Sequence, residues 1–305
     1  MTAIALVADD LTGACDSGLP FLGGGPVHVG LWPHIPQGSL ACAAVSTEAR
    51  GEPADVVYAR SRQAAATFGG DLLYCKLDSL MRGHPVAHLA GVLDAIQRHS
   101  CIVAPALPSE DRTTIGGIQR WPGGETNLIP LLAPLDGRVE LRDAATDADL
   151  DSIAREVLAR GDRVVAGTAG LAAALARAMG LPSPPPATPP ASASPLAVVG
   201  SPAAAGQAAY ARARGWHVQM LGPDSLPRLD CHDGLFMTGG ETAARVLKAS
   251  GAHALDLLGE ALPRAPLARV RGGRLNGVPV VLKAGAFGSE DAIHRGLEAL
   301  HAGSA

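Results

Sequence analysis

Short apolar runs alternate with helix-forming stretches along most of this 305-residue chain. The runs are as short as buried strands, and the stretches between them carry Ala and Leu at helical spacing. Such alternation is typical of α/β folds, in which helices return the chain across a parallel sheet. In the first half we predict strands at residues 4–8, 27–32, 40–45, 72–75, 102–106 and 164–166, and helices at 54–68, 86–99, 149–160 and 171–179.

A proline-rich stretch, LPSPPPATPPASASP at 181–195, interrupts this alternation. Its seven prolines exclude a helix and favour an extended linker, with a long surface loop as the alternative. The same alternation restarts beyond it, so we predict an α/β fold of two domains, each a mostly parallel sheet flanked by helices. They are a first domain at 1–180, the linker at 181–195 and a second domain at 196–305. In the second we predict strands at 196–199, 216–221, 235–237 and 278–282, and helices at 203–214, from 241 and from about 290.

Composition excludes several classes of protein. The 25 Lys and Arg residues face 29 Asp and Glu residues without a long basic run, which argues against a nucleic-acid partner. No apolar run reaches the roughly 18–20 residues that span a bilayer, so no membrane partner is expected. The five cysteines are scattered and form no CxxC pair, so neither a disulfide framework nor a zinc site is indicated and the metal ligands stay unknown. The N-terminus has no basic leader, which favours a cytoplasmic protein.

Polar residues follow three of the strands predicted in the first half. Ligands of parallel sheets bind beyond the carboxyl ends of the strands, where carboxylates can orient a hydroxyl and Arg can hold an anion. A helix cap with a solvated acid would explain the Asp pair equally well, and a surface turn with an ion pair would explain the second group. The candidates are Asp9 and Asp10, then Lys76, Asp78, Ser79 and Arg82, and then Arg112.

Glycine and hydroxyl residues follow three strands predicted in the second half. A strand that passes through glycines into a helix leaves free N–H groups for an anion, although ordinary tight turns would look the same. Neither a Walker motif nor a GxGxxG is present, which also disfavours a nicotinamide-dependent oxidoreductase. The candidates are Ser201, Gly239, Gly240, Glu241, Thr242, Lys283, Gly285 and Gly288. A lobe for a polar anion beside a lobe for phosphates is the layout of a small-molecule kinase.

Seven motifs occur in one order along the chain. They are ADDLTGA at 8–14, KLDSLMRG at 76–83, APALPSEDRTT at 104–114, AGTAGLA at 166–172, VVGS at 198–201, GGETA at 239–243 and KAGAFG at 283–288. Together they resemble the four-carbon acid sugar kinase family, whose members use ATP to phosphorylate the terminal hydroxyl of tetronates. The resemblance implies a sugar-acid-binding first domain and a nucleotide-binding second domain. The chain departs from the family pattern at Cys15, Leu80 and Asp111 and is shorter than its typical members.

The resemblance implies that the first group of candidates faces the substrate and the second faces ATP, and we predict a mechanism in which Arg82, with Lys76, holds the carboxylate of a small-molecule sugar acid. One carboxylate among Asp9, Asp10 and Asp78 accepts the proton of the hydroxyl, and Asp10 is favoured. The glycine turns hold ATP with Mg²⁺, and we expect the two lobes to close about the linker. A homo-oligomer is left open. The alternative is a non-catalytic protein of the same fold that binds nucleotide and sugar acid.

Overall fold

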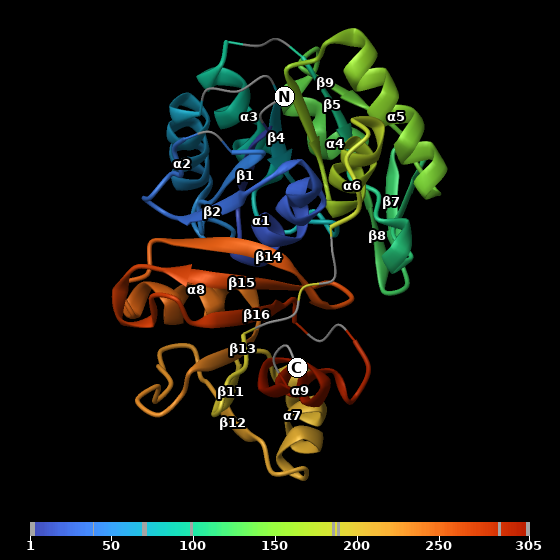
Figure 1. The fold of residues 1–305 in the computed structure, drawn as a ribbon. Coiled ribbons are helices and arrows are strands. Elements are labelled where there is room, and N and C mark those ends of the chain that lie inside the picture. The colour runs from blue at the N-terminus through green and yellow to red at the C-terminus, as the bar shows by residue number, and fades with distance from the viewer. Residues whose placement is uncertain are drawn as a thin grey trace. The chain divides into compact units, whose positions relative to one another are not determined.

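The computed structural model describes residues 4–38, 40–68, 72–97, 100–184, 187, 190–285 and 288–302. The chain divides into two compact units, Met1–Ser183 and Pro184–Ala305, each with its own sheet and helices (Figure 1). Residues 185, 186, 188 and 189 of the predicted linker lie outside the described residues. Within the described part of the chain, no helix has the length and apolar character needed to cross a membrane.

The first unit holds a sheet in the order β2-β3-β1-β4-β10-β5-β9, in which every pair of neighbours is parallel. Its strands are β1 (Ile4–Ala8), β2 (Val27–Leu31), β3 (Cys42–Ser46), β4 (Leu72–Lys76), β5 (Cys101–Ala104), β9 (Val139–Leu141) and β10 (Val164–Gly167). Its helices are α1 (Leu11–Gly18), α2 (Ala54–Thr67), α3 (Pro85–Ala95), α4 (Leu128–Leu132), α5 (Asp147–Arg160) and α6 (Ala169–Ala178). The strands predicted here are confirmed, whereas α3 ends at Ala95 and not at residue 99 as predicted.

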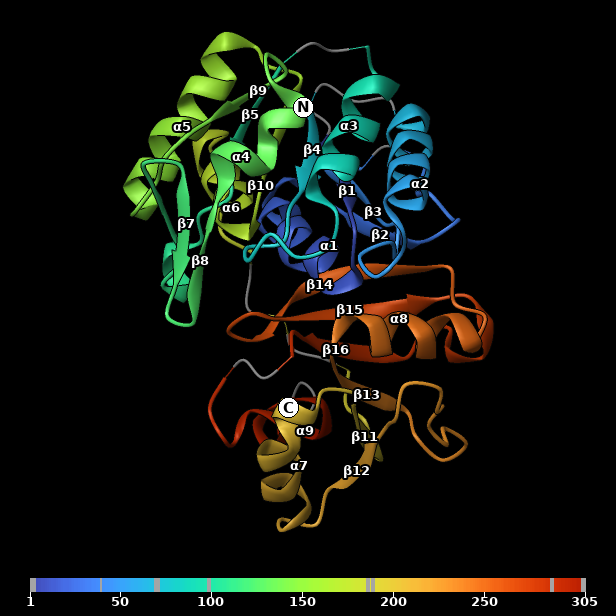
Figure 2. The ribbon, with the colours of Figure 1, turned by 180° about the vertical axis from the view of Figure 1, so that it is seen from behind.

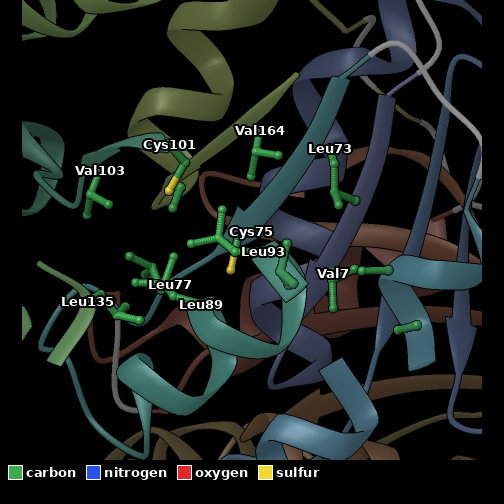
Figure 3. Close-up of a cluster of buried hydrophobic side chains, with 14 of the residues drawn as sticks. Val7, Leu73, Cys75, Leu77, Leu89, Leu93, Cys101, Val103, Leu135 and Val164 are labelled. Carbon is green, nitrogen blue, oxygen red and sulfur yellow. The ribbon is translucent and has the colours of Figure 1, made fainter. Parts of the chain in front are cut away.

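Alternate residues of the parallel strands point to the same face and build the core of this unit. On one face, Val7 and Cys75 pack with Leu89 and Leu93 of α3 (Figure 3), and α2 and α4 cover the same cluster. Helix α6 packs against α1 and α5 on the other face, where the Tyr74 hydroxyl donates to the carbonyl of Thr168 at the start of α6. Both faces are therefore buried, which explains why these strands are almost continuously apolar.

A small antiparallel sheet, which the sequence did not predict, follows β5. It consists of β6 (Thr113–Ile115), β7 (Ile118–Trp121) and β8 (Gly124–Asn127). The turn between β6 and β7 uses Gly116 and Gly117, whose φ angles are +62° and +71°. Asp143 accepts both of their N–H groups, at 2.5 and 3.0 Å, and so fixes this two-residue turn.

The second unit holds a sheet in the order β12-β11-β13-β16-β15-β14 (Figure 2). The first four strands are parallel to one another, whereas β15 pairs antiparallel with β16 and β14 pairs antiparallel with β15. The predicted α/β class with mostly parallel sheets is therefore confirmed. Its elements are β11 (Pro195–Val199), α7 (Ala205–Arg212), β12 (His217–Met220), β13 (Gly234–Thr238), α8 (Gly240–Ala249), β14 (Ala254–Leu262), β15 (Ala265–Arg271), β16 (Pro279–Lys283) and α9 (Ala292–Ala302). Helices α7 and α9 cover one face through Ala208, Ile293 and Leu297.

Candidate active site

Parallel pairing aligns the carboxyl ends of five strands in the first unit. Ala8 of β1 is in register with Ser46 of β3 and with Lys76 of β4, and Gly167 of β10 is in register with Lys76 and with Ala104 of β5. The loops that follow these residues therefore meet at one edge of the sheet. The predicted acids and cations of the first domain lie in these loops, except Lys76, which is the last residue of β4.

Arg50 lies at the centre of this edge, although the sequence analysis did not single it out. Its guanidinium donates to both oxygens of Asp9, at 3.0 and 2.7 Å, and to Asp10 Oδ1 at 2.7 Å. A third carboxylate, Asp78, lies 3.5 Å from Arg50 Nη1. Arg50 follows β3 by four residues, so the strand-end rule that identified the other candidates could also have found it.

Asp10 has the helix-cap role that the sequence offered as one alternative, and its side chain also pairs with a cation of the cluster. It is the N-cap of α1, where Oδ1 accepts the N–H of Gly13 at 3.0 Å, and it also faces the cation cluster. Its Oδ2 accepts the hydroxyl of Thr12 at 2.6 Å. Asp9 is buried and clamped by Arg50, and its carbonyl accepts the N–H groups of Ala49 and Arg50. Both carboxylates thus hold local structure together.

Asp78 is bound mainly by its own loop. Arg82 donates to its two oxygens at 2.9 and 2.7 Å, and the N–H groups of Leu80 and Arg82 donate to Oδ2 at 3.1 and 3.2 Å. The Asp78 side chain is 6% exposed, whereas that of Arg82 is 62% exposed. The ion pair therefore joins a buried acid to a cation that solvent can reach.

The cations keep these acids ionised despite their burial. Burial raises the pKa of Asp10, but Arg50, Lys76 and the Thr12 hydroxyl outweigh it and hold the pKa below its ordinary range. Burial likewise opposes ionisation of Asp78, whose pKa the Arg82 hydrogen bonds, Arg50 and Lys76 nevertheless lower strongly. An edge that presents ionised carboxylates beside guanidinium groups can hold both the hydroxyls and the carboxylate of a small acid.

The other predicted residues of the first unit join the same cluster. Lys76 is buried, and its ammonium donates to the carbonyl of Leu77 at 2.8 Å. A Cβ at Gly13 would lie 2.4 Å from Asp10 Oδ1 and 2.9 Å from Lys76 Nζ, so only glycine allows this approach. The Arg112 guanidinium donates to the hydroxyl of Ser79, which links the loop after β5 to the loop after β4.

A second row of strand ends lies in the second unit. Thr238 of β13 is in register with Val199 of β11 and with Lys283 of β16. Gly200 and Ser201 follow β11, and Gly239 and Gly240 lead from β13 into α8. The predicted phosphate-binding residues that follow β11 and β13 therefore lie along one edge of this sheet, together with Lys283 at the end of β16.

The turn into α8 requires glycine. Gly239 has a φ of +90° and is the N-cap, so the first N–H groups of the helix are available at this edge. Glu241 is exposed in the first turn, and Thr242 packs against Gly200. The buried Thr238 hydroxyl, which the sequence analysis did not select, has no hydrogen-bond partner among the described residues.

Lys283 ends β16 and is 3% exposed. Its ammonium donates to the carbonyl of Gly285 at 2.7 Å, and burial lowers its pKa to about 8. Gly288, with a φ of +89°, accepts a hydrogen bond from the amide of Gln207 at 3.1 Å. Residues 286 and 287 of the KAGAFG motif lie outside the described residues.

The same two units correspond to two known domains. Residues 4–131 match a family model described as a sugar-binding N-terminal domain, and residues 224–293 match one described as a nucleotide-binding C-terminal domain. Curated relatives include a D-threonate kinase of Bordetella bronchiseptica, 28% identical, and one of Cupriavidus necator, 29% identical. Each comparison covers 97% of this chain and 97% of the relative. A D-erythronate kinase of Heliobacterium modesticaldum is 25% identical over 54% of this chain and 50% of the relative.

Solved structures share the fold. A Salmonella typhimurium protein superposes with a TM-score of 0.75 at 19% identity, covering 97% of this chain and 98% of that one. A Bordetella bronchiseptica protein, crystallised with citrate as a domain-swapped dimer, is 25% identical with a TM-score of 0.50 and 98% coverage of both chains.

The chain is thus a two-domain protein with a sugar-binding and a nucleotide-binding domain. The two domain matches and the two D-threonate kinases that align over nearly the whole chain confirm the predicted resemblance to the four-carbon acid sugar kinase family, and these curated relatives are small-molecule kinases. The alignments with the two full-length relatives run over 409 positions, so those relatives carry substantial insertions against the 305 residues here.

Proposed function

We propose that the protein is an ATP-dependent kinase that phosphorylates the terminal hydroxyl of a four-carbon sugar acid of the threonate type. The observation that carries the proposal is the cluster of ionised carboxylates and cations around Arg50 at the strand ends of the sugar-binding domain. A sugar acid presents a carboxylate and several hydroxyls, and the cluster offers a partner for each. The names of the relatives support threonate as the first substrate to test.

In the proposed complex, Arg82 and Lys76 bind the carboxylate of the acid, while Ser79 and Arg112 bind its hydroxyls. Asp9, Asp10 and Asp78 form the acidic part of the site, where one of them orients the terminal hydroxyl and accepts its proton. Phosphoryl transfer demands little covalent chemistry from the protein, so positioning and charge neutralisation supply most of the catalysis.

The phosphates of ATP would bind in the second unit. The N–H groups of the first turn of α8, from Gly240 onward, the turns at Gly285 and Gly288 and the ammonium of Lys283 provide donors for phosphate oxygens, whereas the N–H of Gly239 already donates to the carbonyl of Lys283. Hydroxyls come from Ser201 and Thr242, and Glu241 can hold a water of a metal ion. Among the described residues no group of three His, Cys, Asp or Glu side chains forms a metal site, so Mg²⁺ would be held largely by the phosphates, whose charge it neutralises.

The test is ATP consumption by the purified 305-residue chain with Mg²⁺ and a panel of tetronates, including both enantiomers of threonate and erythronate. We expect turnover with at least one tetronate and none with the matching sugar alcohols, which lack the carboxylate. ATP binding without turnover on any sugar acid would instead indicate the non-catalytic alternative. Light scattering would show whether the chain is a homo-oligomer, as the domain-swapped Bordetella protein suggests.

Arg82→Ala tests which unit binds the acid. We expect KM for the acid to rise about 10–100-fold, because a charge-assisted hydrogen bond contributes about 1.5–3 kcal/mol. KM for ATP should change little. Steady-state kinetics with each substrate varied separately measure both values, and equal increases would contradict the assignment of the acid to this edge.

The lowered pKa of Lys283 leads us to expect that nucleotide binding depends on pH. Its pKa of about 8 means that the ammonium loses its proton as the pH rises past that value, and the attraction to phosphate is lost with it. We expect the affinity for a non-hydrolysable ATP analogue, measured by calorimetry, to fall as the pH rises through about 8. Arg keeps its charge over this range, so Lys283→Arg should flatten the profile; an equally steep profile in this variant would exclude Lys283 as the cause.

A further inference from the structure

Asp78 differs from the other two carboxylates of the cluster in the kind of partner that holds it. Both of its oxygens accept hydrogen bonds from the side chain of Arg82, at 2.9 and 2.7 Å. The Arg82 side chain is 62% exposed, so a ligand that arrives from solvent can reach it. An anion that takes the Nε and Nη2 edge of Arg82 competes directly with Asp78 for these donors.

Asp9 and Asp10 have no such exchangeable partner. Asp10 is held by the N–H of Gly13 and the hydroxyl of Thr12, both of which belong to the first turn of α1. Asp9 is clamped by Arg50, whose side chain is only 24% exposed. Releasing either carboxylate would require opening the start of the helix or the loop after β3.

We propose that Asp78 is the general base of the reaction, and that the carboxylate of the sugar acid uncovers it by drawing Arg82 away. The proposal rests on the proposed kinase function and deepens it, because it selects one of three candidate carboxylates and gives Arg82 a second task. Until the acid binds, Asp78 is masked by its own loop; once it binds, Oδ1 faces the substrate.

The charges around Asp78 favour this exchange. Arg50 Nη1, 3.5 Å away, stays in place and keeps the uncovered carboxylate from being an isolated buried charge. Lys76 also attracts Asp78, while Asp10 repels the negative charge across the cluster. The Arg82 hydrogen bonds are the largest influence that lowers the pKa of Asp78, so their loss makes the carboxylate a stronger base when the hydroxyl arrives.

The proton and electron movements balance within this arrangement. The O–H bond of the terminal hydroxyl breaks as its proton passes to Asp78, and the oxygen forms a bond to the γ-phosphorus of ATP. The bond from that phosphorus to the β,γ-bridging oxygen breaks, and ADP leaves with the electron pair. Asp78 returns its proton to water after the product departs, when Arg82 can bind it again.

Asp78→Asn tests the assignment, with Asp10→Asn as the matched control. Asn keeps an acceptor for the N–H groups of the loop but cannot take a proton, so we expect kcat to fall about 10²–10⁴-fold. KM for the acid should stay level or fall, because Arg82 is freed for the substrate. Asp10→Asn preserves a good N-cap and should lower kcat by less than about 10-fold. If Asp10→Asn lost kcat while Asp78→Asn retained it, Asp10 would be the base.

The pH profile supplies a readout that a purely structural Asp78 would not give. The acid limb of kcat/KM reports the free enzyme, where Arg82 masks Asp78, and the acid limb of kcat reports the complex, where it does not. At saturating MgATP we therefore expect the acid limb of the kcat profile of the wild type to lie at higher pH than the acid limb of its kcat/KM profile. Arg82→Gln should move the limb of kcat/KM upward until the two coincide. Coincident limbs in the wild type would overturn the proposal.

These experiments separate the two levels of inference. A wild-type chain that consumes no ATP with any tetronate disproves the proposed function itself. A wild-type chain that turns over, together with an Asp78→Asn variant that retains its kcat, refutes only the assignment of the base. Thermal unfolding and binding of an ATP analogue show whether Asp78→Asn is folded, and the Arg82→Gln profile decides the question if it is not.

Discussion

Arg50→Met is expected to lower the free energy of unfolding at pH 7 by about 3–5 kcal/mol, the usual cost of leaving buried charges without their partner. Met preserves most of the apolar stem but removes the guanidinium that lies 2.7 Å from Asp9 and Asp10 and 3.5 Å from Asp78. Three carboxylates would then face one another in a largely buried cluster. Urea denaturation of the variant and the wild type measures the difference.

The loss should depend on pH in a defined direction. The folded-state pKa values of Asp10 and Asp78 lie below their ordinary values, so their ionised forms stabilise the fold above about pH 4 and this contribution disappears as the pH falls through the folded pKa values. Without Arg50 the largest influence that lowers the pKa of Asp10 is absent, and the pKa of Asp78 loses part of its lowering while the Arg82 hydrogen bonds remain. The difference between wild type and variant should therefore be largest near neutral pH and shrink in acid.

Arg60→Met is the control for this experiment. Arg60 is 26% exposed, close to the 24% of Arg50, and donates to the carbonyls of Thr47 and Glu48 in the same loop, but it forms its ion pair with the more exposed Glu52. We expect it to cost only about 1 kcal/mol, because exposed ion pairs contribute little, and to do so with little change between pH 7 and acid. A loss as large and as pH-dependent as that of Arg50→Met would show that the loop, and not the carboxylate cluster, determines the effect.

The parallel strands were predictable because they are buried on both faces and therefore read as apolar runs. The antiparallel pair β14 and β15 was missed because exposed charged residues, such as Glu260 in β14 and Arg269 in β15, interrupt the buried apolar positions of these strands. The sheet of β6, β7 and β8 escaped for a similar reason, since most of its residues contact solvent and its turn depends on Asp143, which lies far along the chain. Where a strand contacts solvent, packing does not require apolar residues at regular positions, so the sequence shows no regular pattern that would predict it.

The candidate site shows the same limit. Residues that directly follow a predicted strand, such as Asp10 and Lys76, could be grouped from the sequence because their position implied a shared edge. The same strand-end rule could have included Arg50, four residues beyond β3, but no local motif showed that it lies at the centre of the cluster, because that position comes from β3 lying beside β1. Nor could the sequence show that Arg82 is already paired with Asp78, because an i,i+4 spacing outside a helix does not fix whether two side chains meet.

Gly200→Ala is expected to reduce nucleotide affinity by more than about 10-fold, which corresponds to about 1.4 kcal/mol or more of binding free energy. A Cβ at this position would lie 1.8 Å from Thr242 Oγ1 and 2.5 Å from Thr242 Cβ, so β11 and the first turn of α8 would have to separate. That displacement moves the N–H groups that we propose to hold the phosphates. Calorimetry with a non-hydrolysable ATP analogue measures the loss, and overpacking should also lower stability by about 1–3 kcal/mol.

Gly206→Ala provides the matched control in the same unit. Gly206 lies in α7, is exposed, and has no heavy atom within 4 Å of the position of an added Cβ, so alanine should raise stability by about 0.5–1 kcal/mol and leave nucleotide affinity unchanged. KM for the sugar acid should be unaffected in both variants, because the cluster around Arg50 is built from residues of the first unit alone. Unchanged nucleotide affinity in Gly200→Ala, with the expected loss of stability, would mean that phosphates bind elsewhere than at the start of α8.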